Sequence, residues 1–145
     1  MIPPFEPTGL LPPGIHQSSW EELETRFGGT RHRDRLLAGL TNALHELMRA
    51  GCPRVYLDGS FVTAKEQPGD FDLCYETSGV DPALLSPVFF DFRSGRAAQK
   101  AKFGGELFPA HVEAAAGYNY LEFFQLDSDS GEAKGVVALD IQRLL

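Results

Sequence analysis

VYLDGSFVTAKEQPGDFDLCY, residues 55–75, is the stretch of sequence that decides the expected fold. Its first three residues are β-branched, aromatic and aliphatic, and this run stops at Asp58-Gly59-Ser60. A second apolar run follows a polar segment that contains Pro68 and Gly69. Short apolar runs bounded by glycine and proline are typical of strands. We therefore predict two strands, over residues 54–58 and 70–75, joined by a polar loop.

Two acidic residues of this stretch are candidate metal ligands. In a strand the side chains alternate, so Asp70 and Asp72 share one face. Neighbouring carboxylates repel each other unless a cation lies between them or one is protonated, and Mg²⁺ prefers such oxygen ligands. In addition, Gly59 permits close approach to a ligand, and Ser60 offers a hydroxyl beside a free amide. The stretch thus predicts a site for a divalent cation and phosphate.

A family resemblance rests on the same residues. Gly59-Ser60, followed after a short gap by the Asp70-x-Asp72 strand, resembles the pattern of the nucleotidyltransferase superfamily that includes DNA polymerase β. The segments LPPGIHQSSWEEL and GRAAQKAKFGGELFPA are similar to an uncharacterised small bacterial family within that superfamily. The resemblance implies an α+β fold, in which helices pack on a nucleotidyltransferase-like mixed β-sheet.

The resemblance also implies an activity: metal-dependent transfer of a nucleoside monophosphate from a nucleoside triphosphate to a hydroxyl of an unknown acceptor, which is protein, nucleic acid or a small molecule. It implies two Mg²⁺ ions held by Asp70 and Asp72. A third acid belongs on a neighbouring strand, and Glu106 matches it in order, although glutamate stands where aspartate is commoner. Glu122 and Asp140 remain alternatives.

The most basic stretch is residues 93–103, which we predict to be a helix that ends at Gly104. Arg96 and Lys100 are four positions apart and therefore face the same way on a helix. In an acidic protein this local excess of positive charge predicts contacts with the β and γ phosphates. A solvated helix face is the alternative.

Other segments predict the frame around this site. Ser19 and Glu22 form an S-x-x-E capping box at the start of a helix, and a long apolar stripe from Arg31 predicts a second helix that Gly51 terminates. Residues 88–92 are expected to be a strand or a buried extended segment. Two predicted strands, over residues 120–126 and 136–141, flank a polar, glycine-containing turn and therefore predict a C-terminal β-hairpin.

Length and composition limit the possible classes of protein. With 145 residues we expect a single domain over residues 1–145, in which the five prolines of residues 1–16 favour an extended N-terminal arm. The net charge of −7 argues against broad nucleic-acid binding. Cys52 and Cys74 are expected to be buried thiols, with a disulfide between them left open. Because no apolar run has membrane-spanning length, we expect a cytoplasmic protein that does not bind membranes.

A different class of function is also consistent with these motifs. Small members of the superfamily occur in bacterial toxin-antitoxin and phage-defence pairs, so the chain is alternatively a catalytically inactive binding or regulatory protein with a partner protein. A phosphohydrolase that uses the same acids is a third option. The position of the third carboxylate separates these hypotheses, because catalysis requires Glu106, Glu122 or Asp140 near Asp70 and Asp72.

Overall fold

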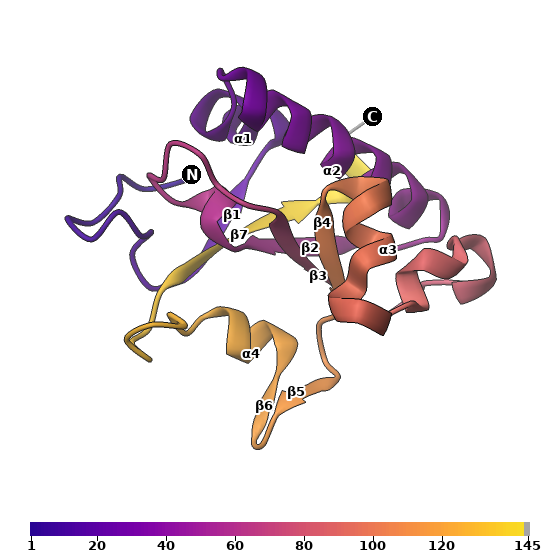
Figure 1. Ribbon diagram of the computed structural model, residues 1–145. Coiled ribbons are helices and arrows are strands. Elements are labelled where there is room, and N and C mark those ends of the chain that lie inside the picture. The colour runs from indigo at the N-terminus through magenta and orange to yellow at the C-terminus, as the bar shows by residue number, and fades with distance from the viewer. Residues whose placement is uncertain (144–145) are drawn as a thin grey trace.

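A five-stranded mixed sheet forms the centre of the protein, in the order β1-β7-β2-β3-β4 (Figure 1). The structure is a computed structural model that describes residues 1–143. β1 runs parallel to β7 and β3 parallel to β4, whereas β2 is antiparallel to β7 and β3. The strands are β1 (Gly14–Ser18), β2 (Arg54–Asp58), β3 (Phe71–Tyr75), β4 (Gly105–Pro109) and β7 (Gly135–Asp140). The two strands expected from the sequence motif therefore lie side by side.

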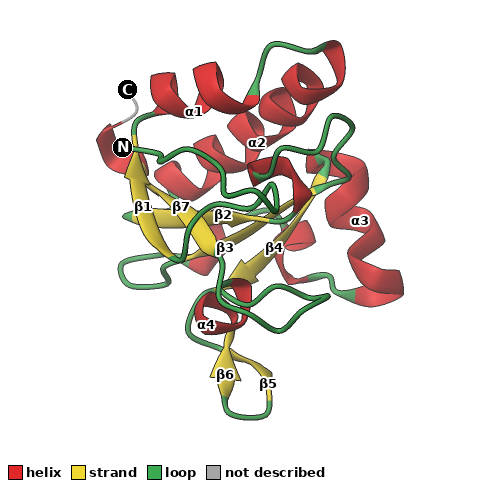
Figure 2. Cartoon of the chain, turned by 90° about the vertical axis from the view of Figure 1, so that its left-hand side faces the viewer, coloured by secondary structure: helices red, strands yellow, loops and turns green. Residues whose placement is uncertain are grey.

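Helices α1 (Trp20–Phe27) and α2 (Arg31–Arg49) cover one face of this sheet (Figure 2). The apolar stripe of α2 is buried against alternate residues of the strands, as its period predicts. Helix α3 (Arg93–Phe103) packs against α2 and β4. A Cβ at Gly39 of α2 would lie 1.8 Å from the Phe103 carbonyl oxygen, so only glycine permits this close contact. The α+β class is confirmed.

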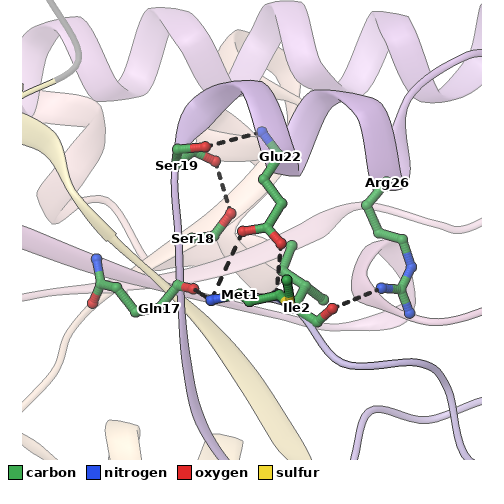
Figure 3. A network of polar contacts seen from close by, with 7 residues as sticks. All are labelled: Met1, Ile2, Gln17, Ser18, Ser19, Glu22 and Arg26. Carbon is green, nitrogen blue, oxygen red and sulfur yellow. Dashed lines mark hydrogen bonds and ion pairs between the residues drawn. The ribbon is translucent and has the colours of Figure 1, made fainter.

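The N-terminal segment is tied to the first turn of α1 (Figure 3). The Ser19 hydroxyl accepts a hydrogen bond from the Glu22 amide, which is one half of the expected capping box. The Glu22 carboxylate does not complete the box, because it accepts from the Ile2 amide at 2.8 Å and lies 3.9 Å from the Met1 ammonium group. Arg26 donates to the Ile2 carbonyl. The expected arm also ends earlier than residue 16, since Gly14 begins β1.

The expected C-terminal β-hairpin is wrong. Residues Tyr120–Phe124 form helix α4, and β7 pairs with β1 and β2 instead. The reason is a capping box at the start of this segment. The Asn119 side chain accepts a hydrogen bond from the Glu122 amide, and the Glu122 side chain accepts one from the Asn119 amide. One isolated bridge, Leu126 to Ala133, joins the two sides of the polar turn.

Three further differences concern short segments. Residues Pro87–Phe90 form a 3₁₀ turn where we expected a strand or an extended segment, since Pro87 takes the first position of a helical turn. Within α3, Ser94, Gly95 and Arg96 have left-handed backbone angles, so regular helix begins after them. A small hairpin of β5 (Glu113–Ala115) and β6 (Tyr118–Asn119) precedes α4. Figures 1 and 2 place α4 and this hairpin on the side of the sheet away from α1 and α2.

Both cysteines are buried and free, as expected for structural thiols. Within residues 1–143, none of the helices combines the length and apolar character needed to cross a membrane.

Candidate functional site

Three acidic side chains form a row across the sheet. Asp58 on β2 is paired in register with Asp72 on β3, and Asp72 is paired with Glu106 on β4. By the strand period these acids share a face with Tyr56, Cys74 and Phe108, which belong to the smaller core cluster opposite α1 and α2. Carboxylates directly opposite each other on neighbouring strands repel. The sheet therefore concentrates negative charge at one place.

The row lines a cleft of about 600 Å³. Gly59, between β2 and the 3₁₀ turn Ser60–Val62, has φ +85°, and a Cβ there would lie 2.9 Å from Asp72 Oδ2. Glycine is thus required both by the backbone and by the nearby carboxylate. The remaining lining residues include further acids as well as basic, polar, aromatic and aliphatic side chains: Leu10, Ser60, Thr63, Lys65, Arg96, Phe108, Tyr120, Phe123, Phe124, Leu126, Asp127, Ser128, Asp129 and Lys134.

Asp58 is neutralised from within the chain. Lys134, just before β7, places its Nζ 2.7 Å from Asp58 Oδ1, and the side chains are only 13% and 8% exposed. The same Asp58 oxygen is buried without a hydrogen-bond partner of good geometry, so the contact is an ion pair rather than an aligned hydrogen bond. Burial raises the pKa of Asp58 and the Lys134 ammonium opposes that rise. Asp58 and Lys134 thus form a buried ion pair, and removing either residue would leave the other as a buried, uncompensated charge.

Asp72 lies in the middle of the row without such a partner. Among residues 1–143, no donor forms a hydrogen bond or an ion pair with its carboxylate. Burial, together with the negative charges of Asp58 and Glu106, raises the pKa of Asp72 from the ordinary 3.8 to about 7. The ionised carboxylate therefore destabilises the fold at neutral pH unless a cation compensates it.

The raised pKa gives a stability prediction with a definite sign. Below pH 3.8 the carboxyl group is protonated in the folded and unfolded states alike. As the pH rises to about 7, the unfolded chain loses this proton first, so the free energy of unfolding falls. Asp72→Asn should remove this slope and, at pH 8 in chelator, raise the free energy of unfolding by about 2 kcal/mol. Urea unfolding at several pH values measures the free energy of unfolding of wild type and variant. Asp140→Asn, at the far end of β7, is the control. A variant no more stable than wild type at pH 8 would contradict the crowding of these acids.

Glu106 is held by two cations from α3. Its carboxylate accepts a hydrogen bond from Arg96 Nε at 2.6 Å, and Lys100 Nζ lies 3.2 Å away. Arg96 reaches this position from a left-handed backbone conformation (φ +63°), which costs energy for a residue other than glycine. Arg96 and Lys100 thus face the same way, as expected, but both pair with Glu106.

The other residues expected at the site lie as follows. Asp70 is exposed, directly precedes β3 and does not line the cleft. Ser60 lines the cleft, and its hydroxyl accepts a hydrogen bond from the Gly69 amide at 2.9 Å. Glu122 caps α4, and Asp140 pairs with Arg54. Among the three candidates for the third acid, the sheet register therefore brings Glu106 beside Asp72.

Sequence reasoning missed Asp58 and Lys134. Asp58 directly precedes Gly59 at the end of the first strand, so strand pairing with the Asp72 strand would have indicated it. Lys134 has no local signal, since only the placement of β7 next to β2 brings it to the cleft. Across residues 1–143, no three His, Cys, Asp or Glu side chains are gathered closely enough to hold a metal ion by themselves.

The comparisons with known proteins concern the family and leave the activity open. No curated protein and no solved structure matches the chain. A family model described as "Family of unknown function (DUF6932)" matches residues 3–140, which is nearly the whole chain. The chain therefore belongs to this family of unknown function, DUF6932.

Proposed function

We propose that the cleft binds Mg²⁺ together with the triphosphate of a nucleoside triphosphate, and transfers the nucleotidyl group to a hydroxyl of an acceptor. The hydroxyl oxygen forms a bond to the α-phosphorus and loses its proton, and the bond from the α-phosphorus to the β-phosphate oxygen breaks, so that pyrophosphate leaves. The observation that carries the proposal is Asp72: a largely buried carboxylate between Asp58 and Glu106, with no cation of its own. A divalent cation would relieve the repulsion among these side chains. The cleft of about 600 Å³ has room for a nucleotide.

The donor set fits Mg²⁺ in the form in which this ion binds nucleotides. Proteins commonly hold Mg²⁺ through one or two carboxylates, and substrate phosphates and water complete the shell. Asp72 supplies one carboxylate without an ion-pair partner, and Asp58, which is paired with Lys134, lies beside it on the adjacent strand, so a cluster of three protein acids is not required. When bound, paired Mg²⁺ ions stabilise the attacking and the leaving oxygens in nucleotidyl transfer.

The chain's own groups have separate roles in this proposal. Gly59 lets the Asp72 carboxylate lie against the backbone at the end of β2, because any side chain there would meet that carboxylate. Lys134 and Arg96 line the cleft and supply positive charge to the phosphates.

Incubation with Mg²⁺, α-labelled nucleoside triphosphates and a cell extract as the source of acceptors tests the transfer. Wild type should produce a labelled product, and Asp72→Asn should reduce the label to the background seen with chelator. Asp140→Asn, which leaves the cleft intact, should label normally. Asp70→Asn tests whether this exposed residue joins the ligand set, as the family resemblance implies. Equal labelling by wild type and Asp72→Asn would refute the assignment.

A second candidate function is nucleotide binding without transfer, as in the regulatory member of a bacterial toxin-antitoxin or phage-defence pair. The observation in its favour is that Arg96 and Lys100 already neutralise Glu106, so the third carboxylate is not available in this arrangement. Calorimetry with Mg²⁺ and a non-hydrolysable triphosphate distinguishes the two, because this candidate predicts binding but no labelled product. Release of phosphate without a labelled acceptor would instead indicate a phosphohydrolase.

A further inference from the structure

The cleft has an aromatic wall next to its acidic row. Phe108 of β4 and Tyr120, Phe123 and Phe124 of α4 all line it, and we call these four residues the aromatic wall. The rings of Phe108 and Tyr120 are stacked, with centroids 4.4 Å apart and an interplanar angle of 24°. Phe124 meets Phe108 edge-on at 5.7 Å. Phe108, Tyr120 and Phe124 therefore form an ordered aromatic cluster rather than a set of separate apolar residues.

One member of the wall is open to solvent. Phe124 is buried, whereas Phe123 is 46% exposed although it lines the cleft. The capping box of Asn119 and Glu122 fixes the start of α4 and thus the place from which Phe123 projects. The cleft therefore presents an accessible aromatic ring beside rings that are already packed.

The wall adjoins the acids. Glu106 and Phe108 are two residues apart on the same face of β4, a separation of about 6.6 Å along a strand. Arg96 spans them, with its Nε 2.6 Å from the Glu106 carboxylate and its Cζ 5.1 Å from the centre of the Phe108 ring. One cleft thus holds carboxylates, a guanidinium group and stacked rings in sequence.

We propose that the aromatic wall is the subsite for the nucleobase, with Phe123 as the ring on which the base stacks. This inference rests on the proposed function, because Mg²⁺ held by the acidic row, together with Arg96, would bind the phosphates of the same ligand. A nucleobase is planar and has a π-face, so its stacking on an aromatic side chain does not require a particular base. The small segment from β5 to α4, inserted between β4 and β7, thereby provides base binding within this short chain.

The test uses two ligands that share the phosphates and differ in the base. The first ligand is 2-aminopurine riboside triphosphate, whose binding is measured by the quenching of its fluorescence, which reports stacking. The second ligand is inorganic tripolyphosphate, whose binding is measured by calorimetry. Both measurements are made with Mg²⁺. Phe123→Ala should weaken binding of the nucleotide at least tenfold and change that of tripolyphosphate less than twofold. Phe123→Trp should retain both. The matched control is Phe90→Ala, which removes an exposed ring outside the cleft.

The outcomes separate this inference from the proposed function. If wild type binds both ligands and Phe123→Ala leaves nucleotide affinity and quenching unchanged, the subsite is overturned and the phosphate site stands. An equal loss for the two ligands also overturns the subsite. If wild type binds 2-aminopurine riboside triphosphate in a Phe123-dependent way but does not bind tripolyphosphate, the subsite stands and the proposed function falls. Binding of neither ligand overturns both.

Discussion

Replacing Arg33 with alanine is expected to lower the free energy of unfolding by about 4 kcal/mol. Arg33 lies on α2 and is only 7% exposed. Its guanidinium group donates to four backbone carbonyls at 2.6 to 3.0 Å, those of Phe27, Phe61, Thr63 and Lys65. Without Arg33 the buried carbonyls of Phe27 and Phe61 lose their donor, and each unsatisfied buried group costs about 1–3 kcal/mol. The loss is large because one side chain serves all four.

Chemical denaturation measures this effect, and two variants make it specific. Arg35→Ala, an exposed arginine on the same helix, should change the free energy of unfolding by less than about 0.5 kcal/mol. Arg33→Lys keeps the charge but not the planar fork of donors, so it should recover less than half of the loss. Because Thr63 and Lys65 line the cleft, Arg33→Ala should also weaken tripolyphosphate binding. A loss of stability no greater than that of Arg35→Ala would contradict this role.

Replacing Lys134 with methionine is expected to cost about 3–5 kcal/mol at pH 8. The substitution keeps the volume of the side chain and removes the ammonium group 2.7 Å from Asp58. Asp58 would then be a buried carboxylate without a counter-charge, next to Asp72. Such a group must be protonated or the fold destabilised. The cost should therefore be smaller at pH 5, where a proton can neutralise Asp58.

The double variant Lys134→Met with Asp58→Asn isolates the charge pair. It should restore most of the lost stability, because neither charge remains in the buried position. Lys65→Met, which removes an exposed lysine from the same cleft, is the control and should have little effect. If the double variant is as unstable as the single one, then the loss comes from packing of the lysine chain and not from its charge.

The elements that local patterns specify are those that sequence analysis predicted. The apolar stripe and the terminating Gly51 predicted helix α2, and the apolar runs at residues 54–58 and 71–75 predicted strands β2 and β3. The prediction for the α4 segment failed because residues 120–126 are a short apolar run, whose conformation depends on the cap at Asn119 and on aromatic contacts with Phe108. Short apolar runs do not distinguish helix from strand by periodicity alone.

For the site, chain order indicated Glu106, and the sheet register places it beside Asp72. The register also brings Asp58 into the row, which a motif defined by consecutive residues does not show. The Lys134 contact depends on the position of β7 between β1 and β2. Contacts between distant segments depend on how the sheet is assembled, so one sequence does not specify them by local spacing.

The placement of β7 has a consequence for how the protein reaches its native state. This strand lies between β1, near the start of the sequence, and β2. The pairings of β7 with β1 and with β2 therefore both require a segment near the other end of the sequence. Closing such long chain loops slows folding. Before β7 pairs with β2, the Lys134 ammonium group does not lie beside the Asp58 carboxylate. The ion pair that neutralises Asp58 thus depends on the slowest kind of contact in this fold, a pairing between segments far apart in the sequence.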